Sequence, residues 1–325
     1  MKVPNRPEIV HIVSHGPHCL DGVAAAAAIA RFYGGSEIRP HFSGNTRINE
    51  VLQELEVGPR FDAQELWITD ISWTAPETDA RLRDLAGRGL RIHWVDHHRT
   101  AIEREAGGKI DVPFATKIVD DRRAAARLVY DHLLERLRSE GRKNPELEKF
   151  HRVVEMADDN DRWLHRVDGS WDLALTVRSM NGIEAYEDLL RIDENVTYTP
   201  RMREALRRVE EEMRTSLQFA ETTRTVRELD SGVRVVAAVC DGYPSEIADR
   251  WGKELPNSVF ALFDLKSGAI SYRRSPDCAV DLSKLAEAFG GGGHPAAAGS
   301  EMPELLTGIA GTAADRIAEA LRRSS

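Results

Sequence analysis

The chain has 325 residues, of which 42% are hydrophobic and 30% charged, and this is enough for two globular domains. Its formal net charge of −9 argues against a protein that coats nucleic acid, because such binding needs local positive charge. The longest apolar run, Val23 to Ala30, is too short to span a membrane. We therefore expect no membrane partner. The odd number of 3 cysteines and the lack of a CxxC pair make disulfides unexpected, so we expect a reducing, cytoplasmic location.

The first half of the chain alternates short apolar runs with helical patterns. Strands are expected at residues 9–13, 38–42, 66–71, 92–95 and 117–119, and helices at 22–33, 78–85 and 122–138. Strand–helix alternation of this kind predicts a parallel sheet with helices on both faces. Ligands of such sheets bind outside the carboxyl ends of the strands.

A helical middle separates this half from a smaller α/β region. Helices are expected at 144–156 and 200–226, then strands at 233–239, 259–263 and 269–272, and helices at 245–253, 280–289 and 304–322. The predicted class is therefore α/β in both domains. We expect a parallel-sheet domain at 1–198, a helical linker at 199–230 and a smaller domain at 231–325.

Side chains that can bind metals follow several of the expected strands. They are His15, His18, Cys19 and Asp21 after the first strand, Asp70 in the third, and Asp96, His97 and His98 after the fourth. Each one alone is more often structural, and Asp21 could be only a helix N-cap. Several strand ends with such residues together favour a metal site, and imidazole with carboxylate suits Mn²⁺, Zn²⁺ or Fe²⁺ better than Ca²⁺. Two clusters around a central Asp indicate a two-metal site that activates water.

A burst of acidic residues ends the helix expected in the middle of the chain. Asp158 is the ligand that we expect there, because it directly follows the small, apolar Ala157, and Asp159 and Asp161 are alternatives. Acidic residues at a helix C-terminus oppose the helix dipole, and a bound cation would explain their presence.

Taken in order, these motifs resemble those of the DHH phosphoesterases. The residues that carry the resemblance are His15, Cys19 and Asp21, then Asp70, then Asp96-His97-His98, then Asp158. The resemblance implies two divalent cations, with Mn²⁺ first and Mg²⁺, Zn²⁺ or Fe²⁺ as alternatives. It implies that His15, Cys19 and Asp70 hold one ion. It implies that Asp21, Asp70, His97 and Asp158 hold the other, so that Asp70 bridges the two.

The same resemblance assigns catalytic roles to the rest of the triplet. His98 would face the scissile phosphate, and Asp96 would orient a histidine from behind. Cys19 is a departure, because the common motif has an Asp at this position. A thiolate would favour softer ions than Mg²⁺.

The C-terminal half extends the resemblance. The segment Phe289–Gly299 is similar to the glycine-rich GGGH motif of the associated C-terminal domain, and Ser271–Ser275 is similar to its arginine segment. The substrate-binding residues implied are Arg273, Arg274, Gly291, Gly292, Gly293 and His294. Glycine N–H groups can approach a phosphate without Cβ obstruction, and an arginine can bind it with two donors. Strand alternation implies that one of the two arginines faces the substrate.

The resemblance implies a metal-dependent phosphoesterase that acts on short nucleotide substrates. These would be short oligonucleotides, nucleoside 3′,5′-bisphosphates, or linear or cyclic dinucleotides. A single-strand exonuclease of the RecJ type is the nearest alternative, disfavoured because the chain is short and acidic and has no evident additional nucleic-acid-binding domain. A pyrophosphatase is another alternative, and Cys19 motivates a non-catalytic nucleotide sensor. No stable protein partner is implied, and a homodimer is left open.

Overall fold

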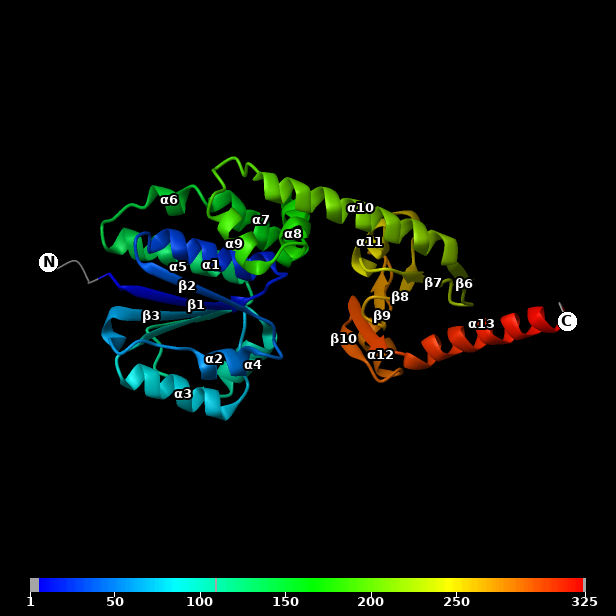
Figure 1. The fold of residues 1–325 in the computed structure, drawn as a ribbon, viewed down its shortest axis with the longest axis horizontal. Coiled ribbons are helices and arrows are strands. Elements are labelled where there is room, and N and C mark those ends of the chain that lie inside the picture. Colours follow the sequence, from blue (N-terminus) through cyan, green and yellow to red (C-terminus); the bar gives the residue numbers. More distant parts are fainter. Residues whose placement is uncertain (1–5, 109, 324–325) are drawn as a thin grey trace. The chain divides into compact units, whose positions relative to one another are not determined.

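The computed structural model describes residues 6–108 and 110–323. The chain divides after Val209 into two compact units, and each unit contains its own sheet (Figure 1). The α/β class expected from the sequence is confirmed. Among the described residues, no helix is both long enough and apolar enough to cross a membrane.

A five-stranded parallel sheet forms the centre of the N-terminal unit, in the order β2-β1-β3-β4-β5. Its strands are β1 (Ile9–His15), β2 (Glu37–Ser43), β3 (Gln64–Thr69), β4 (Arg91–Asp96) and β5 (Thr116–Val119). The chain runs outward from β1 to β2 and then crosses to β3 on the other side of β1. This reversal places a topological switch point at the carboxyl ends of β1 and β3, where ligands of such sheets bind.

Helices cover both faces of this sheet. One layer contains α1 (Leu20–Phe32), α5 (Ala125–Ser139), α7 (His151–Asp161), α8 (Ser170–Arg178) and α9 (Gly182–Leu189), and the other contains α2 (Ile48–Glu54), α3 (Pro76–Gly87) and α4 (Arg99–Ala106). Helix α1 is buried along its whole length. Its alanines, Ala24–Ala28, let β1, α5 and α7 pack closely around it, which fixes the position of its first turn at the edge of the sheet.

The N-terminal unit differs from the expected elements mainly in its helices. The single helix expected at 144–156 is two helices, α6 (Pro145–Glu148) and α7, because the chain breaks at Lys149 and the fully buried Phe150. Tertiary packing of Phe150 thus overrides a continuous helical pattern. Helices α2, α4, α8 and α9 and the short 3-10 helix η1 (Phe61–Ala63) were not expected.

The C-terminal unit is a mixed six-stranded sheet in the order β10-β11-β9-β8-β7-β6. Its strands are β6 (Thr225–Glu228), β7 (Arg234–Cys240), β8 (Ser258–Asp264), β9 (Ala269–Arg274), β10 (Gly292–His294) and β11 (Ala297–Glu301). Helix α11 (Pro244–Glu254) connects the parallel pair β7 and β8, α12 (Leu282–Glu287) packs on the opposite face, and α13 (Pro303–Arg323) follows β11.

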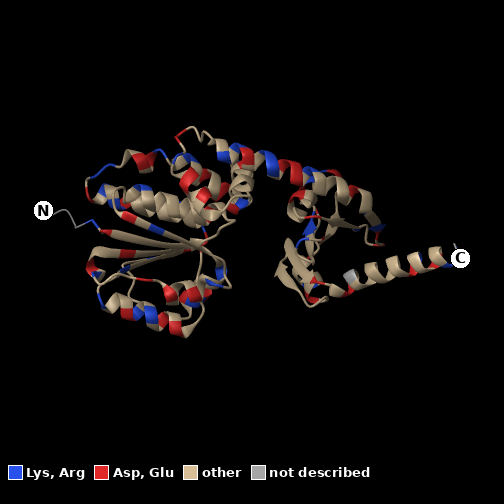
Figure 2. Ribbon diagram, viewed as in Figure 1, with Lys and Arg blue, Asp and Glu red and all other residues tan. Residues whose placement is uncertain are grey.

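Helix α10 (Pro200–Thr223) runs through the boundary between the units and carries charges of both signs along its length (Figure 2). Met202 and Ala205 pack into the core of the N-terminal unit, and Ala220 packs into that of the C-terminal unit. The segment expected as a separate linker therefore contributes to both cores.

Candidate active site

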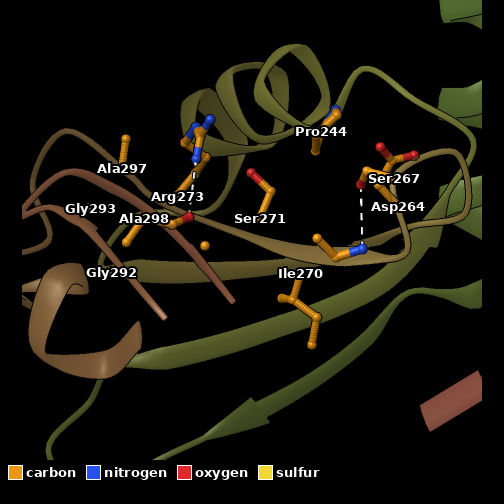
Figure 3. Close-up of a pocket in the computed structure, with 12 residues that line it drawn as sticks. Pro244, Asp264, Ser267, Ile270, Ser271, Arg273, Gly292, Gly293, Ala297 and Ala298 are labelled. Atoms are coloured by element: carbon orange, nitrogen blue, oxygen red, sulfur yellow. Dashed lines mark hydrogen bonds between the residues drawn. The ribbon is translucent and has the colours of Figure 1, made fainter. Parts of the chain in front are cut away.

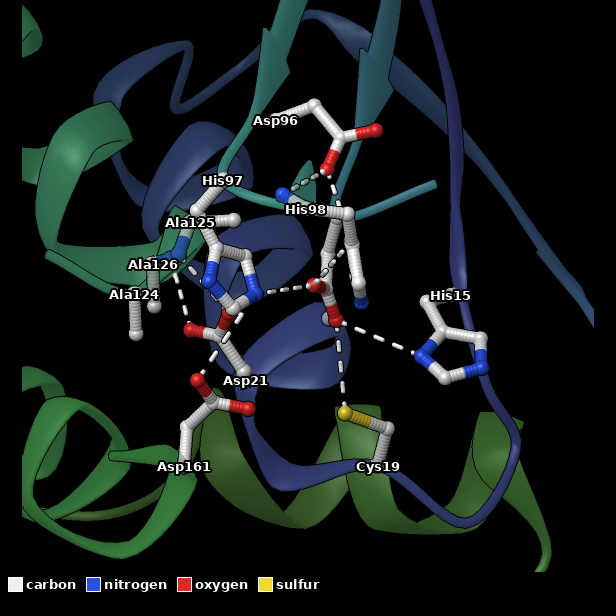
Figure 4. A network of polar contacts seen from close by, with 12 residues as sticks. His15, Cys19, Asp21, Asp96, His97, His98, Ala124, Ala125, Ala126 and Asp161 are labelled. Carbon is white, nitrogen blue, oxygen red and sulfur yellow. Dashed lines mark hydrogen bonds and ion pairs between the residues drawn. The ribbon is translucent and has the colours of Figure 1, made fainter. Parts of the chain in front are cut away.

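The carboxyl ends of β1, β3 and β4 bring most of the expected ligands together at one edge of the sheet (Figure 4). Three overlapping groups of side chains could each hold a cation within the described part of the chain. They are His15, Cys19 and Asp70; Asp70, His97 and His98; and Asp21, His97 and Asp161. We refer to these seven residues as the acid–histidine cluster.

Asp70 lies at the centre of the acid–histidine cluster. Its Oδ2 accepts a hydrogen bond from Cys19 Sγ at 3.3 Å and is 3.4 Å from His15 Nδ1, while its Oδ1 is 3.1 Å from His97 Nε2. The residue is 1% exposed and has a left-handed backbone with φ 58°, which aspartate tolerates better than most residues. One buried carboxylate thus faces two different sets of ligands, as a bridging ligand must.

Gly22 allows this close assembly. A Cβ at this position would lie 2.2 Å from the carbonyl oxygen of His15 and 3.1 Å from Asp70 Oδ2. Only glycine therefore lets the first turn of α1 sit directly against the end of β1. The close approach brings the positive end of the α1 dipole toward the carboxylates.

Asp21 and Asp158 both cap the N-terminus of α5, but only Asp21 also reaches the acid–histidine cluster. Asp21 accepts hydrogen bonds from the N–H groups of Ala125 and Ala126, each at 2.7 Å, and its Oδ2 is 3.7 Å from His97 Nε2. Asp158 accepts from Ala124 N at 2.8 Å.

The second oxygen of Asp158 is occupied by arginines. Its Oδ2 is 3.1 Å from Arg123 Nη1 and 3.5 Å from Arg162 Nη1. Asp158, the ligand expected from the sequence, thus belongs to none of the three groups. Asp161, an alternative in the sequence analysis, stands there instead, with Oδ2 3.6 Å from His97 Nε2. The two residues are one helical turn apart, and the docking of α7 brings the later one to the edge of the sheet.

Asp96 fixes the orientation of His98. Its Oδ1 accepts hydrogen bonds from His98 N at 3.0 Å and lies 2.7 Å from His98 Nδ1, while Ser72 Oγ donates to Oδ2. Asp96 is fully buried, whereas the His98 side chain is 45% exposed. The bond to Asp96 raises the pKa of His98 and engages its Nδ1, so Nε2 is the ring nitrogen that remains for another partner.

His18, another candidate from the sequence, is directed elsewhere, because its Nδ1 is 2.7 Å from the carbonyl oxygen of Arg178. Sequence reasoning did not identify Ser72, Arg123 or Arg162. Arginine and serine are common surface residues, so only their contacts with Asp96 and Asp158 distinguish them.

The acid–histidine cluster concentrates negative charge. Burial and then repulsion from Asp70 raise the pKa of Asp21 and of the Cys19 thiol well above their ordinary values. Burial also raises the pKa of Asp161. Burial would likewise raise the pKa of Asp70, but hydrogen bonds from His15 and His97 lower it. Burial disfavours the charged form of His97, yet Asp70 and Asp21 raise its pKa to about 9.

This arrangement fits bound divalent cations. Within the described residues, the ion-pair partners of the cluster's carboxylates are histidines, and no lysine or arginine pairs with them. A divalent cation would stabilise the ionised acids and thiolate and would release protons from the imidazoles. The oxygen, nitrogen and sulfur donors suit transition metals.

The C-terminal unit contains a separate cavity of about 410 Å³ (Figure 3). Arg273 lines it, and its Nη2 donates to Ser245 Oγ at 2.8 Å while Nη1 donates to the Tyr272 carbonyl at 2.8 Å. Arg274, the next residue of β9, instead donates to the Val280 carbonyl at 2.8 Å and does not line the cavity. Successive side chains on a strand point to opposite faces, so Arg273 is the arginine available to a ligand there.

Part of the glycine-rich motif, Gly292–His294, forms strand β10, and the glycines of the motif have different roles. Gly292 and Gly293 line the cavity, whereas Gly291 and His294 do not. A Cβ on Gly291 would lie 2.1 Å from the Gly299 carbonyl oxygen, and one on Gly293 would lie 2.6 Å from Ala298 Cα. No atom lies within 4 Å of a Cβ built on Gly292. Gly291 and Gly293 are therefore required for close packing against β11, and Gly292 leaves room at the cavity.

Known proteins resemble this chain in sequence and in fold. No protein-family profile matches the chain. The oligoribonuclease NrnB of Bacillus subtilis (strain 168) is 25% identical over 308 residues, which cover 90% of this chain and 73% of that protein. The pGpG-specific phosphodiesterase PggH from Vibrio cholerae has a similar fold, with a TM-score of 0.58, 13% identity, and coverage of 96% of this chain and 97% of that one. RecJ from Thermus thermophilus, solved with Mn²⁺, gives a TM-score of 0.52 at 15% identity and covers 92% of this chain and 50% of RecJ.

Proposed function

We propose that the chain is a phosphoesterase of the DHH superfamily that uses two divalent cations to hydrolyse phosphodiester bonds in short oligonucleotides. It is a hydrolase that acts on ester bonds. The observation that supports the two-metal proposal most strongly is Asp70, whose two buried carboxylate oxygens each face a different group of potential ligands.

We propose ligands for the two ions on the basis of the groups within the acid–histidine cluster. His15, Cys19 and Asp70 would hold one ion, and Asp21, Asp70, His97 and Asp161 would hold the other. We favour Mn²⁺, since RecJ was solved with this ion and the thiol of Cys19 disfavours Mg²⁺. Bound divalent ions at such a site lower the pKa of water and neutralise charge on a phosphoryl group.

The residues of the chain itself would position and protonate the substrate. Asp96 holds Nδ1 of His98, which leaves Nε2 able to donate a proton to the leaving oxygen. Arg123 and Arg162 share the single carboxylate of Asp158, and both guanidinium groups could also donate to a phosphate. Asp158 would then position the two arginines and leave the metals to Asp161.

The cavity of the C-terminal unit would bind another part of the substrate. Arg273 can contact a phosphate there, and the open space over Gly292 lets the backbone approach it. Arg274, Gly291 and His294, also expected to bind substrate, have no place among the residues that line this cavity.

The names of two similar proteins support a short substrate. NrnB is named an oligoribonuclease and PggH a pGpG-specific phosphodiesterase, and the chain covers 50% of the RecJ from Thermus thermophilus. We therefore propose a linear dinucleotide as the preferred substrate.

Cys19, Cys240 and Cys278 are free, which agrees with a reducing compartment, and we propose that the enzyme acts in the cytoplasm.

A panel of substrates tests this function directly. Purified protein with Mn²⁺ is expected to hydrolyse pGpG and other diribonucleotides faster than a long single-stranded RNA, a nucleoside 3′,5′-bisphosphate or pyrophosphate. Arg273→Ala is expected to raise the KM for the dinucleotide, whereas the matched control Arg274→Ala leaves it unchanged. Preference for long RNA, or no hydrolysis with Mn²⁺, Mg²⁺ or Zn²⁺, would contradict the proposal.

A further inference from the structure

A group of three aromatic rings, the exposed Trp163 and His165 and the half-buried Trp171, follows the acidic end of α7. The ring centroids of Trp163 and Trp171 are 5.1 Å apart with an interplanar angle of 72°, and those of Trp163 and His165 are 4.9 Å apart at 78°. His165 and Trp171 complete the triangle at 5.6 Å. Edge-to-face contacts of this kind support a ring while they leave one of its faces open. We call these three residues the aromatic triad.

Trp163 is exposed although the protein buries comparable rings. It is 48% exposed, whereas Trp67, Trp73, Trp94 and Trp251 are fully buried. Large exposed apolar side chains that gather at one place often mark a binding site. An exposed tryptophan beside two further rings is therefore a candidate contact for a flat ligand.

The backbone holds this ring in place at a conformational cost. Trp163 has φ 54° and His165 has φ 53°, a left-handed conformation that bulky residues rarely adopt. Strain of this kind persists where the surrounding structure imposes it, and it gathers at functional sites.

Asp159 is the residue that imposes the conformation. This buried carboxylate accepts hydrogen bonds from Arg166 N at 2.8 Å and from Ser170 Oγ at 2.6 Å. Its backbone carbonyl also accepts from Leu164 N at 2.9 Å. The loop that carries Trp163 and His165 is thus fixed on both sides of His165, and Trp171 stands in helix α8, so the triad is a preformed surface.

The aromatic triad begins close along the chain to Asp161, a residue of the acid–histidine cluster. Trp163 is two residues after Asp161, so their Cα atoms are at most about 7 Å apart. Asp161 reaches to 3.6 Å from His97, and Arg162, between the two, pairs with Asp158. A candidate metal ligand, an arginine and an exposed tryptophan therefore succeed one another along the chain.

From this succession we infer that Trp163 stacks on one nucleobase of the substrate while the adjacent cluster binds its phosphate. A nucleotide joins a charged phosphate to a flat ring, and side chains suited to each follow one another along the chain here. Stacking is tolerant of sequence, since every base has a π-face. This inference rests on the proposed function and adds to it a site for a base in the N-terminal unit.

The kinetic test compares a dinucleotide with an analogue that lacks one base. For the dinucleotide, Trp163→Ala is expected to raise KM about 10-fold or more with little change in kcat, since base–aromatic stacking is worth this much in other proteins. Trp163→Phe should retain most of the affinity. For the abasic analogue, the wild type should already be weak and Trp163→Ala should have no further effect. Phe219→Ala, which removes an exposed aromatic ring elsewhere, is the control.

A binding measurement separates this inference from the proposed function. Calorimetric titration of the dinucleotide with Ca²⁺ in place of Mn²⁺ reads affinity without turnover. Weaker binding by Trp163→Ala supports the stacking site even if no metal supports hydrolysis, a result that would sink the proposed function alone. Equal binding by the wild type and Trp163→Ala, equal effects on both substrates, or no binding at all would overturn the stacking site.

Discussion

Strand β3 has a buried carboxylate near each end, and the two ends differ in what neutralises it. Glu65, near the start of the strand, accepts hydrogen bonds from Arg91 and from the hydroxyl of Tyr33, and His93 Nε2 is 3.1 Å away. Asp70, just after the end of the strand, meets imidazoles and a thiol instead. Both carboxylates are at most 1% exposed.

The difference shows why one end is structural and the other is a candidate metal site. At Glu65 the guanidinium of Arg91 supplies a permanent positive charge, and burial, which would raise the pKa of Glu65, is outweighed by its partners. At Asp70 the nearby groups include two more acids, Asp21 and Asp161, and no lysine or arginine within the described residues. A buried carboxylate is therefore not in itself a sign of metal binding. The absence of a fixed cation beside it is the informative feature.

The largest effect is expected from Asp70→Asn. Loss of the shared carboxylate should remove Mn²⁺ binding and lower kcat on a dinucleotide by about 1,000-fold or more, since both ions depend on it. Calorimetric titration with Mn²⁺ and initial-rate measurements give the two readouts. Glu65→Gln is the matched control at the other end of β3 and should keep the wild-type metal stoichiometry. If Asp70→Asn still bound two ions, Asp70 would not be their shared ligand, and the contrast between Asp70 and Glu65 would fail.

Glu65→Gln should instead affect stability. The substitution leaves Arg91 without its carboxylate, and we expect the free energy of unfolding to fall by about 2–3 kcal/mol. This value is at the low end for a buried pair because the Arg91 side chain is 39% exposed. Urea denaturation in EDTA measures the change. A loss below about 0.5 kcal/mol, the size of an ordinary surface effect, would mean that Glu65 is not held as the structure indicates.

Asp161→Asn and Asp158→Asn distinguish the two acids of α7. Asp161→Asn should weaken Mn²⁺ binding by about 10- to 100-fold and make the metal-free protein slightly more stable, because one of several like charges is removed. Asp158→Asn should leave Mn²⁺ affinity within about 3-fold and cost about 1 kcal/mol of stability, because its ion pairs with Arg123 and Arg162 lose their negative charge. If Asp158→Asn weakened Mn²⁺ binding more than Asp161→Asn did, Asp158 and not Asp161 would be the metal ligand.

Cys19→Asp is expected to have the smallest effect. A carboxylate in place of the thiol should shift the ratio of the Mg²⁺-supported to the Mn²⁺-supported rate by about 10-fold toward Mg²⁺. Cys19→Ser, which offers no negative charge, is the control and should lower both rates without this shift. An unchanged ratio in Cys19→Asp would show that this side chain does not contact a metal.

The sequence by itself determined the strands of the N-terminal sheet and the edge of that sheet at which the candidate metal ligands gather. Apolar runs such as Ile9–Val13 and Ile92–Val95 can only be buried strands in an alternating α/β chain, and their parallel arrangement places the residues after each strand on one edge. His15, Asp70 and His97 could therefore be placed together from the sequence. So could the presence of a second, smaller domain.

Only the tertiary structure decided which of two residues close in the sequence is directed toward a site. Asp158 and Asp161 differ by 3 helical positions, which leaves them about 60° apart around α7, so periodicity cannot say which one meets the sheet. The packing of α7 against α1 and α5 settles their places. Arg273 and Arg274 pose the same problem on β9, where alternation separates the two but the surrounding segments decide that Arg273 lines the cavity while Arg274 bonds to the Val280 carbonyl. Sequence patterns report which residues share a face, and the neighbours of that face come from contacts between distant segments.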